Sequence, residues 1–148
     1  MNYMNDAIEL RPATKEDYDF LYGLHCSAMR GYVEATWGWD AAWQQRHFEQ
    51  NFKPEVNQII MLHGQDIGLV SVQQTENELF ISNVQILSEH QNKGIGSFII
   101  SKVIEQAQQQ GRPVTLQVLK VNPARRLYER LDFVVEGETD THFKMRRA

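Results

Sequence analysis

The segment from Gln91 to Gly96 constrains the fold of this chain most, because it joins a predicted strand that ends near Leu87 to a predicted helix over 97–110. Gly94 and Gly96 have no Cβ, so the backbone can turn sharply and bring its N–H groups close to a ligand. The helix adds unpaired N–H donors and the positive end of its dipole. The segment therefore suits phosphate binding, although a bare turn between a strand and a helix uses the same glycines.

A second segment, 122–133, predicts a helix opened by Pro123 at its first turn. Its sequence reads Asn-Pro-Ala-Arg-Arg-Leu-Tyr-Glu-Arg-Leu-Asp-Phe. Together the two segments resemble the Gln/Arg-x-x-Gly-x-Gly/Ala loop and the Asn, Ala and Tyr helix of the GCN5-related N-acetyltransferase (GNAT) family. The resemblance is closest over 79–134 and extends more loosely over the whole chain. It implies acetyl-coenzyme A as the donor and an amine as the acceptor.

The chain, residues 1–148, is predicted to form a single N-acetyltransferase (GNAT) domain, since this length buries a core without disulfides or metal. The resemblance implies an α/β (α+β) fold, with a mixed sheet of about seven strands flanked by about four helices. Strands are expected at 8–11, 59–62, 67–72, 78–87, 114–119, 133–136 and 142–145. Helices are expected from a cap at Thr14 to about Ala28, where Gly31 interrupts, and over 41–52, with Asp40 as its cap. Two more are expected over 97–110, with Gly111 as its C-terminal cap, and after Pro123.

Composition limits the compartment and the partners. A single cysteine, Cys26, cannot form an internal disulfide, which favours a reducing cytoplasm. We expect no membrane association, because no apolar run approaches the roughly 20 residues that span a bilayer and the N-terminus lacks signal-peptide features. The net charge of −4 disfavours nucleic acid as a partner. The five histidines show no metal-ligand spacing, so no metal is expected.

The charge is unevenly divided along the chain. Residues 1–90 carry five Lys and Arg against thirteen Asp and Glu, whereas residues 91–148 carry ten against six, which gives −8 and +4. A basic C-terminal part matches a donor with several phosphates, and an acidic N-terminal part would favour a cationic acceptor. Solvated faces with an accidental imbalance explain the same counts.

The resemblance assigns the donor site by matched position. Most contacts to the donor's pyrophosphate are expected from main-chain N–H groups, with a charge from Lys93, while Gln91 hydrogen-bonds the loop and fixes its shape. At the end of the preceding strand, the backbone of Ile86 and Leu87 is expected to pair with the pantetheine arm. Arg125 and Arg126 are candidates for phosphate contacts, although arginines on a helix are often only solvated. The cofactor-binding set is Ile86, Leu87, Gln91, Asn92, Lys93, Gly94, Ile95, Gly96, Ser97, Asn122, Arg125 and Tyr128.

Tyr128 and Asn122 are the candidate catalytic pair. Acetyl transfer needs a proton for the departing thiolate, and a phenol with a pKa near 10 can supply it. Tyr128 matches the family position of that acid, and Asn122 matches a position that hydrogen-bonds the pantetheine. A helix tyrosine packed against the sheet is the alternative interpretation of Tyr128. The family pattern ends this helix in Gly-Phe, whereas this chain has Asp132, a residue that tolerates the left-handed conformation.

The acceptor site is expected between the first two helices, as in the resembling family. Aromatic and acidic side chains alternate there and would suit an ammonium group through cation–π contact and ion pairing. The candidate substrate-binding residues are Tyr32, Glu34, Trp37, Trp39 and Asp40, with Trp43 beside them. Phe80 lies near the position where some family members carry an acid. The amine is therefore expected to lose its proton through water or to a carboxylate from elsewhere, with Glu34 and Asp40 as candidate general bases. Packing in the core explains the tryptophans equally well.

These observations predict a cytoplasmic acetyl-coenzyme A-dependent N-acetyltransferase that acts directly on a primary amine of a small molecule or a peptide. A catalytically silent acyl-coenzyme A-binding regulatory module of the same fold is the alternative. An unrelated nucleotide binder is disfavoured, because the glycine turn lacks a P-loop ending and a third Rossmann glycine. The resemblance also suggests a homodimer, with the two terminal strands as an available edge.

Overall fold

The structure is a computed structural model that describes residues 7–36 and 38–148. Its centre is one seven-stranded sheet in the order β1-β2-β3-β4-β5-β7-β6. The strands are β1 Ile8–Pro12, β2 Asn57–Leu62, β3 Gln65–Gln74, β4 Leu79–Ile86, β5 Val114–Leu119, β6 Val134–Glu138 and β7 His142–Arg147. Neighbouring strands are antiparallel except β4 and β5, which pair in parallel.

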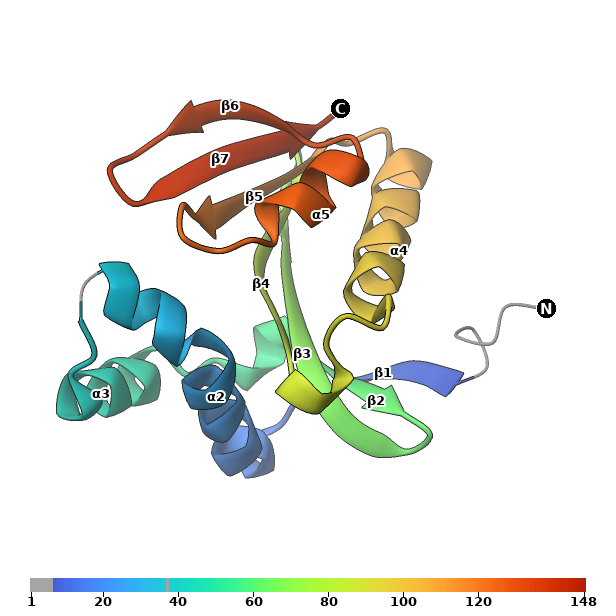
Figure 1. Cartoon of the computed structure of the whole chain (residues 1–148). Helices are drawn as coiled ribbons and strands as arrows, with labels where there is room; N and C mark the ends of the chain where they lie inside the picture. The colour runs from blue at the N-terminus through green and yellow to red at the C-terminus, as the bar shows by residue number, and fades with distance from the viewer. Residues whose placement is uncertain (1–6, 37) are drawn as a thin grey trace.

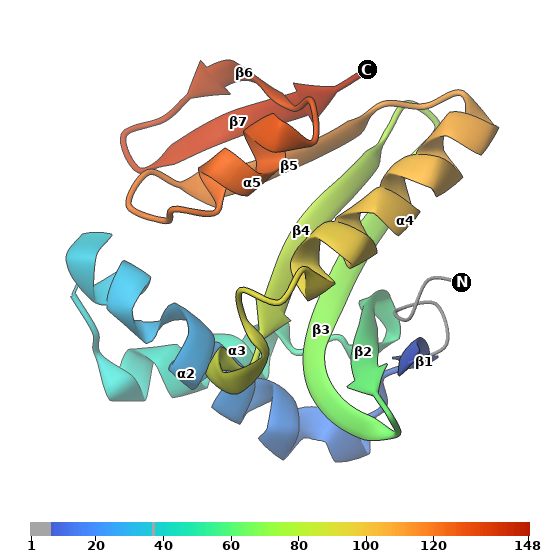
Figure 2. The same cartoon turned by 45° about the vertical axis from the view of Figure 1, so that its right-hand side comes forward.

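Within the described residues, four α-helices accompany this sheet: α2 Tyr18–Thr36, α3 Ala41–Asn51, α4 Ile95–Gln110 and α5 Arg125–Arg130. Three short 3-10 segments join them to strands: η1 Lys15–Asp17, η2 Pro54–Val56 and η3 Ser88–His90. In Figures 1 and 2, α4 runs along β4, α5 lies beside β5, and α2 and α3 lie together. The predicted mixed sheet of seven strands with four helices is confirmed.

Helix and turn ends follow the local chemistry. The Thr14 hydroxyl accepts the Glu16 N–H while Asp17 accepts the Thr14 N–H, so the predicted capping box is present. Asp40 accepts the Trp43 N–H at 3.0 Å and caps α3. Gly111, at φ 66°, ends α4 in the left-handed conformation, as its position predicted.

The first helix differs from the prediction in length. After η1, α2 begins at Tyr18 and continues through Gly31 to Thr36, so the expected interruption at Gly31 is wrong. One glycine inside a helix costs only about 1 kcal/mol relative to alanine. The helix compensates by burying Leu21 and Leu24, both 1% exposed, against the sheet.

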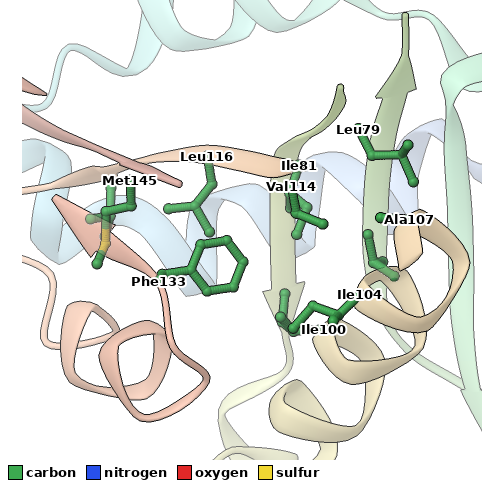
Figure 3. Close-up of a cluster of buried hydrophobic side chains, with 11 residues drawn as sticks. Leu79, Ile81, Ile100, Ile104, Ala107, Val114, Leu116, Phe133 and Met145 are labelled. Atoms are coloured by element: carbon green, nitrogen blue, oxygen red, sulfur yellow. The ribbon is translucent and has the colours of Figure 1, made fainter. Parts of the chain in front are cut away.

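The two faces of the sheet carry separate apolar clusters. On one face α4 packs on the strands, and Figure 3 shows Ile100, Ile104 and Ala107 from this helix with side chains of β4, β5 and β7 and with Phe133. A second cluster joins the first turns of α4 to strands β1 to β3. On the other face, Leu21 and Leu24 of α2 pack on Ile59 and Leu69.

Candidate active site

The parallel pair β4 and β5 separates partway along its length. Pairing covers only Leu79 to Ile81 with Val114 to Leu116, and β4 then continues to Ile86 while β5 continues to Leu119 (Figure 1). The register between β3 and β4 also shifts at this point, since Ser71 faces Asn83 and Val72 faces Ile81, which leaves Ser82 as an extra residue. Such a bulge bends the strand and changes which side chains face which side. The sheet is therefore open between the ends of β4 and β5.

The glycine segment lies directly after the open end of β4. The Gln91 side-chain amide donates a hydrogen bond to the Ile86 carbonyl oxygen at 2.8 Å, which holds the loop against the strand. Asn92 and Gly94 adopt positive φ angles of 61° and 82°. No side chain caps the first turn of α4, so its N–H groups are available to a ligand.

A cleft of about 560 Å³ joins this loop to the segment that precedes α5. Its walls are the end of β4, the loop, the first turn of α4 and the segment 122–130. Arg126 and Arg130, four residues apart on α5, add positive charge to its lining. Ile86 and Leu127 supply apolar lining near Gly96. The cleft thus combines open N–H donors, cations and an apolar wall.

Asn122 and Tyr128 both line this cleft. The Asn122 side-chain oxygen accepts the Ala124 N–H at 2.9 Å and so shapes the turn into α5. Tyr128 packs edge-on against Phe133, with ring centroids 5.9 Å apart, and burial raises the pKa of its phenol above the ordinary value. Its hydroxyl therefore keeps its proton at neutral pH and is suited to donate one.

Tyr128 and Asn122 also line a second pocket, of about 230 Å³, between β4 and β5. Ser82, Asn83 and His142 contribute polar groups to it. Burial lowers the pKa of the His142 imidazole, and its Nδ1 lies 2.8 Å from the Thr141 hydroxyl. Tyr128 thus lines two neighbouring spaces, one beside the glycine loop and one beside β5.

A family model described as Acetyltransferase (GNAT) domain matches residues 55–135 of the chain. The matched range includes the glycine loop, α4 and the segment with Asn122 and Tyr128. This protein belongs to the GNAT family. A search of curated protein sequences found no significant match.

Solved GNAT structures share the fold at low sequence identity. The PaiA N-acetyltransferase of Thermoplasma acidophilum in complex with coenzyme A is similar at 14% identity and TM-score 0.77, over 95% of this chain and 98% of that one. An acetyltransferase of Thermus thermophilus is similar at 15% identity and TM-score 0.74, over 95% and 96%. Naa50 of Arabidopsis thaliana, in complex with the bisubstrate analogue CoA-Ac-MVNAL, is similar at 13% identity and TM-score 0.67, over 96% and 99%.

The structure brings most of the predicted donor-site residues of this GNAT protein together. Nine of them line the cleft: Ile86, Gln91, Asn92, Gly94, Ile95, Gly96, Ser97, Asn122 and Tyr128. Leu87, Lys93 and Arg125 do not line it. The Leu87 N–H donates to the Ile67 carbonyl, and Arg125 pairs with Glu129 and stacks on the Phe143 ring at 4.2 Å. Donor contacts by all twelve residues stay predictions.

Of the predicted acceptor residues that the structure describes, Glu34, Trp39 and Asp40 line neither pocket. Glu34 lies on the exposed part of α2, and Asp40 caps α3. The Trp39 ring lies 6.0 Å from the His25 ring, which fits the packing interpretation of this tryptophan. Trp37 and the Tyr32 side chain are outside the described residues. The acceptor role of this set, and of Glu34 as a base, stays a prediction.

Sequence reasoning missed residues in the linings of the cleft and of the second pocket. The sequence contains a signal that could have placed Arg130 in the cleft. This residue follows Arg126 by four residues, so the two side chains share one face of α5. Gln85 and His142 have no such signal, since their positions depend on the bulge in β4 and on the β5–β7 pairing, in which Leu119 faces His142. In residues 7–36 and 38–148, no group of three His, Cys, Asp or Glu side chains has a metal-site arrangement. No helix within these ranges is long and apolar enough to cross a bilayer.

Proposed function

We propose that this protein transfers an acetyl group from acetyl-coenzyme A directly to a primary amine within a ternary complex. The observation that best supports this proposal is that one cleft joins the uncapped glycine loop to Tyr128 in a chain of the GNAT family. The residues fit the donor: N–H groups and two arginines suit the phosphates, and the apolar wall suits the pantetheine arm. Coenzyme A or its analogue in two similar structures supports the same ligand class.

In the proposed reaction the neutral amine nitrogen attacks the thioester carbonyl carbon, the new C–N bond forms, the C–S bond breaks, and the nitrogen releases one proton to solvent as it becomes an amide. Tyr128 donates its phenolic proton to the departing sulfur and regains one from solvent. Because burial raises its pKa, the phenol stays protonated in neutral and mildly alkaline solution. The acidic N-terminal part of the chain supports a cationic acceptor, such as a protonated alkylamine that loses its proton before attack.

The test is release of free coenzyme A from acetyl-coenzyme A across polyamines, amino acids, aminoglycosides, arylamines and lysine peptides. Tyr128→Phe should lower kcat by about 100-fold on the best acceptor while the calorimetric Kd for acetyl-coenzyme A stays within about twofold. Tyr18→Phe is the matched control, because Tyr18 contacts Glu49 and Phe48 away from both pockets. Full activity of Tyr128→Phe would rule out the assigned acid.

The same panel distinguishes the silent module from the enzyme. A silent acyl-coenzyme A-binding protein would bind the donor in calorimetry but release no coenzyme A with any acceptor class. In that case Tyr128→Phe and wild type would give the same background rate. An enzyme would show turnover on at least one class, with product confirmed by the mass of one added acetyl group.

A further inference from the structure

Gln85 is a buried polar residue that the proposed chemistry has not used. It lies near the end of β4, only 3% exposed, and its side-chain oxygen has no hydrogen-bond partner among the described residues. A buried amide oxygen without a partner destabilises a fold, so native structures seldom retain one without a reason. Gln85 also lines the cleft that contains Tyr128 and the glycine loop. A ligand in the cleft can supply the missing donor.

The strand register shows which face of the sheet Gln85 belongs to. In the β3–β4 pair, Gln85 lies directly opposite Leu69, and Leu69 packs with Leu21 and Leu24 of α2. Its neighbours Val84 and Ile86 instead pack against the cluster that contains the first turns of α4. Gln85 therefore projects toward the α2 face, opposite the face that carries the glycine loop and α4.

This placement separates Gln85 from the donor's side of the sheet. The proposed donor is held by the glycine loop and the first turn of α4, which lie on the α4 face. Because β4 and β5 are paired only over 79–81 and 114–116, β5 does not pair with β4 beside Gln85, and Gln85 lines the cleft at this gap in the sheet. The α2 face is thus the side from which a second substrate can approach Tyr128.

We propose that the side-chain amide of Gln85 hydrogen-bonds the nitrogen of the acceptor amine and turns its lone pair toward the thioester carbonyl, an inference that rests on the reaction proposed above. An amide oxygen accepts an N–H hydrogen bond but takes up no proton, so Gln85 orients the amine and does not act as the base. The acceptor's N–H satisfies the buried oxygen, and binding relieves the penalty carried by the free protein.

Two substitutions test this assignment. Gln85→Met keeps the length of the side chain and removes its polar atoms. Thr115→Val is the matched control, because Thr115 is 7% exposed, has a hydroxyl without a hydrogen-bond partner among the described residues and lines neither the cleft nor the second pocket. Both variants should unfold at or above the wild-type temperature, since each removes a buried unpaired polar atom. A clearly lower melting temperature of Gln85→Met alone would show a structural role and overturn the inference.

Binding of the two substrates is then measured separately. In Gln85→Met, the calorimetric Kd for acetyl-coenzyme A should stay within about twofold, while KM for the best amine of the panel should rise about tenfold or more. Thr115→Val should change neither. A tenfold loss of donor affinity would place Gln85 on the pantetheine arm, and an unchanged amine KM would leave it without a ligand, so either result overturns the inference.

A measurement of amine binding that needs no turnover tests the role of Gln85 independently of the transfer reaction. The protein saturated with coenzyme A is heated with each amine of the panel, and the rise in melting temperature reports amine binding. Wild type and Thr115→Val should be stabilised by the recognised amine, and Gln85→Met should lose that shift. Amine binding that depends on Gln85 without any turnover would refute the proposed reaction and retain the amine site. A wild-type protein stabilised by no amine would refute the amine site.

Discussion

The side-chain amide of Gln91 donates to the carbonyl oxygen of Ile86 across 2.8 Å, and so ties the glycine loop to the open end of β4. This contact fits the predicted role of Gln91 in shaping the loop, and that role stays a prediction. Gln91→Ala should weaken acetyl-coenzyme A binding by about tenfold in calorimetry, because the loop N–H groups lose their fixed direction. Stability should fall by about 1 kcal/mol or less. Gln109→Ala, on the exposed end of α4, is the control, and equal donor affinity in the two variants would contradict the role of Gln91.

A substitution at Gly96 tests whether the donor lies close to the backbone here, because a side chain at this position causes no backbone strain. A Cβ built at this position would lie 3.7 Å from Leu127 Cδ2 and 3.8 Å from Ile86 Cδ1, which are ordinary contact distances. Gly96→Ala should therefore leave the melting temperature unchanged or slightly raised, as alanine favours the helix. The added methyl group should weaken acetyl-coenzyme A binding by about tenfold or more. Calorimetry checks the affinity, and wild-type affinity would show that the donor does not approach Gly96.

Gly94 and Gly111 stand at opposite ends of α4 and both have left-handed backbones, with φ of 82° and 66°. Alanine at either position should lower stability by about 1–2 kcal/mol, because a Cβ is strained in this region. Only Gly94 lines the cleft, so Gly94→Ala should also weaken acetyl-coenzyme A binding, whereas Gly111→Ala should not. Urea unfolding and calorimetry on both variants provide the comparison. A similar loss of donor affinity in both variants would mean that the effect comes from general destabilisation.

Asp132 occupies the position where the family pattern has glycine, and its φ of 71° confirms the left-handed conformation expected there. Asp132→Gly should remove the strain of a side chain in this region and raise the melting temperature by about 3 °C. Differential scanning calorimetry measures the change. Since Phe133 beside it is 2% exposed and packs in the core, a fall in melting temperature would mean that the aspartate contributes an interaction that outweighs the strain.

Arg11 connects β1 to two carboxylates, with hydrogen bonds of 3.0 and 2.8 Å to Asp17 and 2.9 Å to Asp66. The hydrogen bonds from Arg11 lower the pKa of Asp17, so its contribution to stability is present above the unfolded pKa near 3.9 and is lost as pH falls below it. Asp17→Asn should lower stability at pH 7 by about 1 kcal/mol, since Arg11 is partly exposed. Urea unfolding at pH 7 and pH 3 should show the difference shrinking at pH 3, unlike for exposed Asp19→Asn.

The homodimer and the acceptor set stay predictions. β6 pairs with β7 on one side and forms one edge of the described sheet on the other, and it exposes Val134 and Val135 by 64% and 40%. The predicted dimer would use such an edge. Glu34 and Asp40 lie outside the two pockets described. An acceptor large enough to reach them from Tyr128 would use both regions, and the amine panel distinguishes such acceptors from small amines.

Local chemistry made most element ends predictable. The caps at Thr14 and Asp40, the left-handed Gly111 and the strand over 114–119 depend on residues adjacent in the chain, and each is confirmed. The prediction that Gly31 interrupts the helix was wrong because tertiary packing, and not local sequence, decides this point. The burial of α2 against the sheet outweighs the low helix propensity of one glycine.

The sequence by itself identified the family and predicted the donor loop and the functional pair Asn122 and Tyr128, because these are short segments with a recognisable spacing. Only the tertiary structure decided that β4 and β5 separate after Ile81, that one cleft joins the end of β4 to the segment 122–130, and that Gln85 is buried there without a partner among the described residues. The physical reason is strand register. One extra residue at Ser82 changes which side chains face α2 and which face α4, and that choice depends on pairing with β3, not on neighbours along the chain.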